Sequence, residues 1–139
     1  GLKKEMPGFT SEEAKLTFEA RKILGCPELR IASTCVRVPV FYAHSIAIHA
    51  EFSAPISAEQ AREILSRAEG IKVIDDMPTA QYPMPLFIGG GDDVGVGRIR
   101  VDPSVENGLA LWCCGDNIRK GAAQNAVQIA EAMIRRGLI

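Results

Sequence analysis

The chain has 139 residues, of which 47% are hydrophobic, so its length fits one ordinary domain with a real core. Its 16 basic and 17 acidic side chains leave a formal charge of −1, which excludes a general field that attracts nucleic acid or an anionic membrane. No apolar run approaches the ~20 residues that span a bilayer, and the first residues lack the apolar core of a signal peptide. We expect a soluble, cytoplasmic protein with a single domain over residues 1–139.

The first predicted helix begins after Thr10 and ends at about Gly25. Thr10 is the expected N-cap, and Glu13 at the third helical position completes a capping box. Helical spacing predicts that three side chains form the buried stripe: Leu16, Ile23 and Leu24.

Four polar residues at the start of the chain stand out as candidates for chemistry. Glu12 and Lys15 share one helical face near the free amide groups of the first turn, where they form an exposed ion pair or a site for a ligand. Arg37 lies in a predicted strand at 34–41, and its guanidinium offers a planar fork for a carboxylate or phosphate. His44 precedes a second predicted strand at 45–54, and histidine is the residue type best suited to moving protons near neutral pH. Arg37 and His44 indicate a site that binds an acid and moves protons, or else a satisfied structural pair.

The remaining elements alternate between helix and strand. A capping box at Ser57–Gln60 predicts a helix ending near Gly70, and the last helix is predicted from about Ile118 to Arg136. Strands are predicted at 71–74, 96–101 and 109–114, with a long irregular excursion over 75–93. This order predicts an α+β fold, with a mostly antiparallel mixed sheet and helices on one face. The other face needs a partner, and a homodimer is one way to cover it.

Several other kinds of site are disfavoured by the sequence. The glycine-rich run 89–97 is not expected to bind a dinucleotide, because a strand follows it where a helix is needed; we expect a flexible loop. Cys35 and His44 could be a nucleophile and its base, but a packed cysteine is the commoner outcome. The spacing of the four cysteines and two histidines predicts no metal site, and we expect reduced, mostly packed thiols with a core position for Cys113 or Cys114.

Three motifs together resemble the C-terminal catalytic and dimerisation domain of the aspartate-semialdehyde dehydrogenases, from about Thr10 to the end. The first is Glu-x-x-Lys at 12–15, and the second is Arg-Val-Pro-Val at 37–40 followed by His44-Ser45. The third is Asp-Asn-x-Arg-Lys-Gly-Ala-Ala at 116–123. Ala43 departs from the family, which usually has glycine before the histidine. If this position takes a positive φ, alanine strains the bend that places His44.

The resemblance implies a fold like the C-terminal domain of glyceraldehyde-3-phosphate dehydrogenase-like enzymes. It implies a homodimeric, NADP-dependent enzyme that converts L-aspartyl 4-phosphate to L-aspartate 4-semialdehyde and phosphate, on the pathway to lysine, threonine and methionine. It implies that Glu12 contacts the substrate ammonium, Lys15 the phosphate and Arg37 the carboxylate. It also implies that His44 is the general acid/base and that Asn117 contacts the nicotinamide.

In that family the nucleophilic cysteine and the NADP-binding fold belong to an N-terminal region that we expect this chain to lack. The isolated chain is therefore predicted to be inactive, with NADP held mainly by the absent region. Two alternatives stay open. The chain could be a stand-alone dimerisation or regulatory module, or it could belong to a related acyl-phosphate or semialdehyde reductase, in which Glu12 would have no ammonium to bind.

Overall fold

The structure, a computed structural model, describes residues 6–139 and consists of two compact units, one ending at Pro39 and one beginning at Val40. Among these residues, no helix combines the length and apolar character needed to cross a membrane.

The first unit is built around helix α1 (Ser11–Ile23), and its capping box is confirmed. Thr10 Oγ1 accepts a hydrogen bond from the Glu13 amide at 3.3 Å, while Glu13 Oε2 accepts one from the Thr10 amide at 2.7 Å. The other oxygen of this buried carboxylate accepts the Cys35 amide at 2.9 Å. The backbone hydrogen bonds from Thr10 and Cys35 hold the pKa of Glu13 below its ordinary value of 4.5. Glu13 therefore ties the helix to the segment that follows it.

Two sequence predictions for this part of the chain are wrong. The predicted buried stripe of α1 is exposed, up to 80% at Ile23, and the helix buries Ala14 and Thr17 beside Glu13 instead. Within its unit, α1 is joined to the segment after it through Glu13, whose backbone oxygen accepts from Ser33 Oγ and whose side chain accepts the Cys35 amide, so the helix side that carries Glu13 is the covered one. Residues 34–41 are irregular rather than a strand, because a strand needs a ladder partner and no described strand pairs with them.

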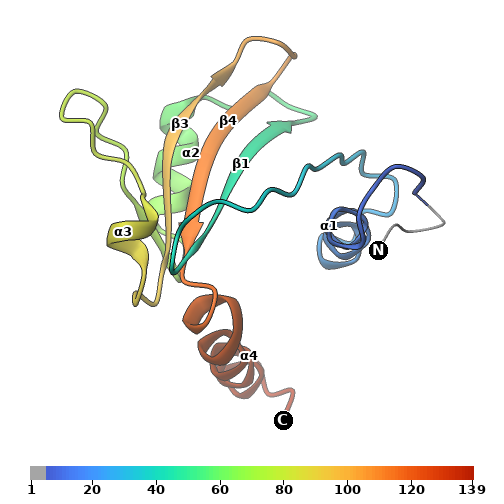
Figure 1. Cartoon of the computed structure of the whole chain (residues 1–139), viewed down its shortest axis with the longest axis vertical. Helices are drawn as coiled ribbons and strands as arrows, with labels where there is room; N and C mark the ends of the chain where they lie inside the picture. Colours follow the sequence, from blue (N-terminus) through green and yellow to red (C-terminus); the bar gives the residue numbers. More distant parts are fainter. Residues whose placement is uncertain (1–5) are drawn as a thin grey trace. The chain divides into compact units, whose positions relative to one another are not determined.

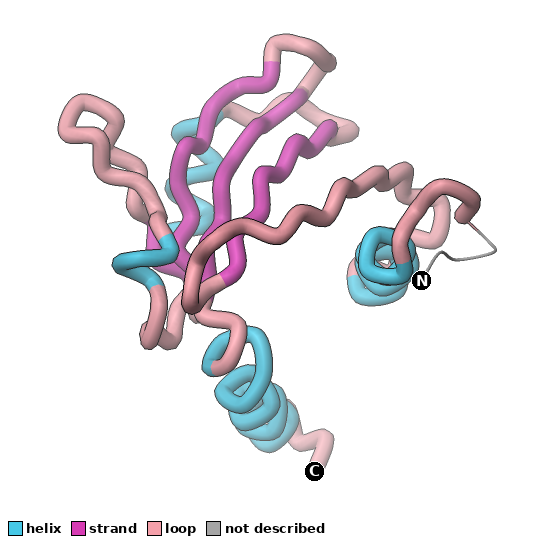
Figure 2. The backbone as a smooth tube through the Cα atoms, viewed as in Figure 1, coloured by secondary structure: helices cyan, strands magenta, loops and turns pink. Residues whose placement is uncertain are grey.

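The second unit contains a four-stranded mixed sheet in the order β1-β4-β3-β2 (Figures 1 and 2). Strand β4 is antiparallel to both β1 and β3, whereas β2 is parallel to β3. The predicted α+β class, with a mostly antiparallel mixed sheet, is confirmed. The strand bounds are β1 (His44–Glu51), β2 (Ile71–Val73), β3 (Val94–Asp102) and β4 (Gly108–Gly115).

Helix α2 (Ala58–Ser66) covers one face of this sheet, where it contacts β2 and β3 (Figure 1). Its predicted capping box is present, with Ser57 Oγ accepting the Gln60 amide at 3.1 Å. The small side chains of α2 allow a close approach to the larger apolar residues of the strands. The resulting core cluster consists of Ala58, Ala61, Val96, Ile99 and Leu109.

The predicted excursion over 75–93 is irregular apart from the single turn α3 (Pro85–Ile88), and its residues Pro83 and Ile88 lie against Gly95 and Gly97 of β3. Gly95 and Gly97 alternate along β3 with residues of the α2 face, so they face this excursion. A Cβ atom on Gly95 would lie 2.7 Å from Ile88 Cδ1, and one on Gly97 would overlap the Ile74 carbonyl oxygen. The expectation of a flexible loop is therefore wrong from residue 94 onward, where glycine serves close packing.

A buried aspartate, paired with a partly exposed arginine, supports the β-bulge in β3. The chain takes a positive φ of 54° at Arg98, where the pairing with β4 shifts. The Asp75 side chain, 1% exposed, accepts the Arg98 amide at 2.6 Å and the Arg62 Nε–H at 2.7 Å. These hydrogen bonds satisfy the buried carboxylate and fix the bulge.

The last predicted helix is confirmed, with a π-helical start. The π turn η1 (Arg119–Ala123) leads into α4 (Gln124–Arg135), which leaves the end of β4 (Figure 1). Gly137 has a φ of 64°, and its amide donates to the Ile134 carbonyl at 3.0 Å. This left-handed residue ends the helix.

His49 and Asp102 form a pair between β1 and β3. His49 Nδ1 lies 2.7 Å from Asp102 Oδ2, so this nitrogen carries the donated proton. The hydrogen bonds from His49 and Ser104 lower the pKa of the buried Asp102 carboxyl well below its ordinary value of 3.8. Because folding lowers this pKa, the carboxylate stabilises the fold above the unfolded pKa, and that stabilisation is lost as the pH falls through the folded pKa.

We expect Asp102→Asn to be less stable than the parent at pH 7, and the difference to shrink as the pH falls below about 4. Urea unfolding at a series of pH values measures this difference. Asp93→Asn is the matched control, because Asp93 is exposed and should change stability little at any pH. A deficit of the Asp102 variant that stays constant down to the lowest pH would contradict the expectation.

Candidate functional site

Glu12 and Lys15 lie together on the first turn of α1. Lys15 Nζ is 3.4 Å from both carboxylate oxygens of Glu12, and both side chains are exposed. A pair of this kind contributes little to stability because water competes for both partners. Its carboxylate and ammonium are therefore available to a ligand with a cation and an anion of its own.

Arg37 lies in the irregular segment near the end of the first unit. Its side chain is exposed, and within that unit it makes no hydrogen bond or ion pair among the described residues. A guanidinium with all five N–H donors unoccupied can take a carboxylate in a bidentate geometry. Arg37 is thus chemically suited to its predicted role as a carboxylate ligand.

His44 is the first residue of β1 and pairs with Gly115 at the end of β4. Its ring is exposed, and it forms none of the described hydrogen bonds of the second unit. An imidazole has two ring nitrogens that can each donate or accept a hydrogen bond, so it has the chemistry of a general acid or base. Because His44 is paired at the end of the sheet, the backbone from which its ring extends is fixed.

Ala43, directly before His44, has a φ of 73°, so the condition under which alanine strains this bend is met. The residue is 8% exposed and packs with Ile88 and Cys114. Its amide donates a hydrogen bond to Asn117 Oδ1 at 3.1 Å. The side chain of Asn117 therefore holds the bend that directly precedes His44, and both are predicted site residues.

Two alanines with positive φ allow the strain to be separated from packing. Glycine removes about 1–2 kcal/mol of strain at such a position and loses about 0.4–1 kcal/mol through the freer unfolded chain. At the exposed Ala80, with a φ of 55°, we expect Ala80→Gly to be more stable by about 0.5–1 kcal/mol. At Ala43 the lost methyl burial, about 0.8 kcal/mol, offsets the gain. Thermal unfolding of both variants checks this, and a larger gain for Ala43→Gly would contradict it.

Asp116 is the residue of this site whose role sequence reasoning did not assign. It is 5% exposed, and its Oδ1 accepts the amides of Ile118 and Arg119, both at 2.8 Å, while Oδ2 accepts the Gly90 amide at 2.7 Å. The hydrogen bonds from the Arg119 and Gly90 amides keep the pKa of the carboxyl below its ordinary value of 3.8. An aspartate just before a predicted helix was the available signal, since such residues cap helices.

The cysteines divide between core and surface. Cys114 is buried in the core, as predicted for one residue of its pair, and burial raises the pKa of the Cys113 thiol. Cys26 and Cys35 are exposed, so the expectation of mostly packed thiols is wrong for these two. Both lie in irregular segments of the first unit.

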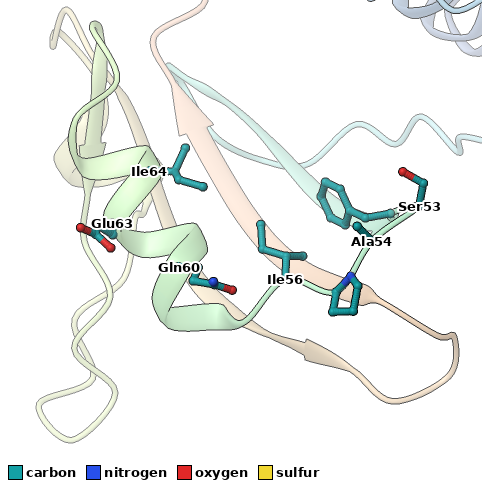
Figure 3. A pocket seen from close by; sticks show the side chains of 8 residues that line it. Ser53, Ala54, Ile56, Gln60, Glu63 and Ile64 are labelled. Atoms are coloured by element: carbon teal, nitrogen blue, oxygen red, sulfur yellow. The ribbon is translucent and has the colours of Figure 1, made fainter.

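The predicted site residues fall into two groups. Glu12, Lys15 and Arg37 belong to the first unit, while His44 and Asn117 lie at one end of the β1–β4 pair in the second. Within the second unit a groove of about 510 Å³ between residues 52–56 and α2 contains none of them (Figure 3). Phe52, Ile56 and Ile64 make that groove largely apolar.

Comparison with known proteins gives a consistent match. The family model described as semialdehyde dehydrogenase, dimerisation domain, matches residues 2–120. The aspartate-semialdehyde dehydrogenase of Aquifex aeolicus is 52% identical over 132 residues, which is 95% of this chain and 39% of that protein. The enzyme of the same name from Mycolicibacterium smegmatis is 56% identical over 91% of the chain and 35% of its own length. The chain thus spans well under half of these relatives.

Solved structures show the same similarity. Aspartate semialdehyde dehydrogenase II of Vibrio cholerae, complexed with ASA, matches with a TM-score of 0.86 and 45% identity over 97% of this chain and 40% of that one. Aspartate semialdehyde dehydrogenase of Candida albicans, solved with NADP, matches with a TM-score of 0.77 and 26% identity over 96% of this chain and 45% of that one.

Proposed function

This chain belongs to the family of semialdehyde dehydrogenase dimerisation domains, and on that basis we propose that it is the C-terminal part of an aspartate-semialdehyde dehydrogenase. The proposed reaction is the NADPH-dependent conversion of L-aspartyl 4-phosphate to L-aspartate 4-semialdehyde and phosphate, in the cytoplasmic synthesis of lysine, threonine and methionine. The observation that carries the proposal is the match over 97% of the chain to the Vibrio cholerae enzyme complexed with ASA.

The substrate is an amino acid with an acyl phosphate, and the charged residues of the first unit complement its groups. Arg37 would hold the α-carboxylate through two parallel hydrogen bonds, and Glu12 would accept those of the α-ammonium. Lys15 would bind the phosphate near the free amides of the first turn of α1. These roles require ligand groups to replace the weak contact between Glu12 and Lys15.

His44 would act as the general acid/base. Its imidazole would take the proton of the attacking thiol, which belongs to the remainder of the enzyme, and would shuttle a proton as the tetrahedral intermediate forms and collapses. When bound, NADPH supplies the hydride that reduces the acyl group. Asn117 fits a contact with the nicotinamide, because its side chain is exposed and its Nδ2 makes no hydrogen bond with described residues of its unit.

A homodimer is the proposed assembly. The family is a dimerisation domain, and the second unit exposes large apolar side chains on β1, directly after it and on α2, among them Ile46, Phe52 and Ile64. Apolar surface of this kind marks a contact with a partner.

The test is to assay the chain alone and joined to the remainder of a relative. In the joined enzyme, this chain replaces the matching segment of the Aquifex aeolicus protein. We expect no turnover by the isolated chain, and phosphate-dependent reduction of NADP with aspartate semialdehyde by the joined enzyme. Turnover by the isolated chain would refute the predicted inactivity, and a folded joined enzyme without turnover would refute the proposed reaction.

A pair of arginine variants links the activity to this chain. Arg37→Lys loses the bidentate fork, so we expect kcat/KM for the semialdehyde to fall by at least tenfold, which corresponds to about 1.4 kcal/mol. Arg30→Lys is the control, because Arg30 is an exposed arginine of the same unit with no assigned role. Equal effects of the two substitutions would remove the evidence that Arg37 binds substrate.

A further inference from the structure

We propose that Asn117 is a positioning residue for His44 as well as a cofactor contact, with a different atom of its amide serving each role. Oδ1 holds the strained bend at Ala43 and so fixes the start of β1, where His44 stands. Nδ2 is left for the nicotinamide carboxamide. The second role rests on the proposed function, whereas the first depends only on the fold.

Strand register brings Asn117 to the bend. His44 pairs with Gly115, the last residue of β4, so the antiparallel pair ends at these two residues. The chain enters β1 through Ala43 and leaves β4 toward Asn117, two residues past Gly115. Both segments therefore lie at the same end of the sheet, where no further ladder hydrogen bond fixes either one.

The bend needs support because its conformation is costly. An alanine with a φ of 73° is strained by about 1–2 kcal/mol. It also buries an amide, at 8% residue exposure, that β1 does not pair. The 3.1 Å hydrogen bond to Asn117 Oδ1 satisfies that amide and favours the strained conformation over extended alternatives.

Asn117 can act as a support because its own backbone is anchored. The buried Asp116 accepts amides from both sides: Gly90 in the glycine-rich segment, and Ile118 and Arg119 at the start of η1. Arg119 is held further by an ion pair with Asp92. A side chain that leaves such a fixed point loses little freedom when it binds the bend.

The hydrogen bond also determines what Asn117 can offer a cofactor. An amide N–H is a donor, so the Asn117 atom facing Ala43 must be the carbonyl oxygen, and the NH₂ group points elsewhere. Asn117 can then donate to the nicotinamide carboxamide oxygen. It cannot at the same time use its oxygen to accept from the nicotinamide NH₂ in a straight bidentate pair.

Two substitutions separate the roles. Asn117→Ala removes both, whereas Asn117→Asp keeps an acceptor for the Ala43 amide and replaces the donor with an oxygen. In the 139-residue chain, we expect Asn117→Ala to speed hydrogen exchange of the Ala43 amide by about fivefold or more, and Asn117→Asp not to. In the joined enzyme both variants should raise the KM for NADP, while kcat at saturating NADP should stay higher in Asn117→Asp. Asn125→Ala, an exposed asparagine of α4, is the control.

The exchange measurement decides the positioning role without any enzyme assay. Unchanged Ala43 exchange in Asn117→Ala, or equally fast exchange in both variants, would overturn it. An unchanged KM for NADP in Asn117→Asp would overturn the donor role. Lack of turnover in the unmodified joined enzyme would refute the proposed function and leave the exchange result standing.

Discussion

Gly97→Ala is expected to lower the free energy of unfolding by at least about 3 kcal/mol, the upper part of the range for overpacked sites. The added Cβ would overlap the backbone oxygen of Ile74 and lie 2.7 Å from Pro83 Cδ. Neither group can rotate away, because Ile74 donates its amide to the Val96 carbonyl at 2.8 Å and Pro83 accepts from Trp112 Nε1 at 3.0 Å. The excursion would have to leave the sheet.

Thermal unfolding of the chain measures this effect, and a fall in Tm of roughly 10 °C is expected for a domain of this size. Gly115→Ala is the matched control on β4, since its Cβ would meet Val94 Cγ2 at an ordinary 3.5 Å. We expect its stability to differ from the parent by less than about 1 kcal/mol. Equal Tm values for the two variants would show that the close approach at Gly97 is not a constraint.

Features set by neighbouring residues were predicted from the sequence. Both capping boxes form as expected, because a side chain at the N-cap and one three residues later meet in any helix. The strands predicted at 96–101 and 109–114 also form, and they pair antiparallel as β3 and β4. The fold class followed from the order of these elements.

Features set by distant residues were not predicted. The glycines at 95 and 97 are required by Pro83 and Ile88, whose position on the sheet no local pattern specifies. The valines at 36, 38 and 40 have the propensity for a strand, but propensity does not form one without a neighbour to complete the ladder. Helical periodicity predicted that Leu16, Ile23 and Leu24 are buried, and this prediction is wrong because periodicity alone does not say what covers a helix face.

The candidate site shows the same division. Its residue types came from motifs, which also raised the question of a positive φ at Ala43, and that conformation is present. The hydrogen bond between the Ala43 amide and Asn117 joins positions 74 residues apart in the sequence. Spacing along the chain carries no information about such a contact, so the link between the bend and Asn117 could be found only in the structure.

His44→Gln is expected to reduce kcat of the joined enzyme by about 100- to 10,000-fold, the usual contribution of a general acid/base. Glutamine keeps polarity and approximate size but cannot take up or release a proton near neutral pH. The exposed ring of His44 makes no described hydrogen bond in its unit, so stability should change by less than about 0.5 kcal/mol. Steady-state kinetics and thermal unfolding of the same preparation measure the two quantities.

The chain supplies its own control, because it has 2 histidines and they lie on the same strand. His49→Gln removes the contact with Asp102, so it should lower stability while leaving kcat near that of the unmodified enzyme. The two substitutions are therefore expected to affect different quantities: His44→Gln lowers activity, and His49→Gln lowers stability. A loss of kcat at both positions that follows the loss of folded protein would mean that neither histidine does the proton chemistry.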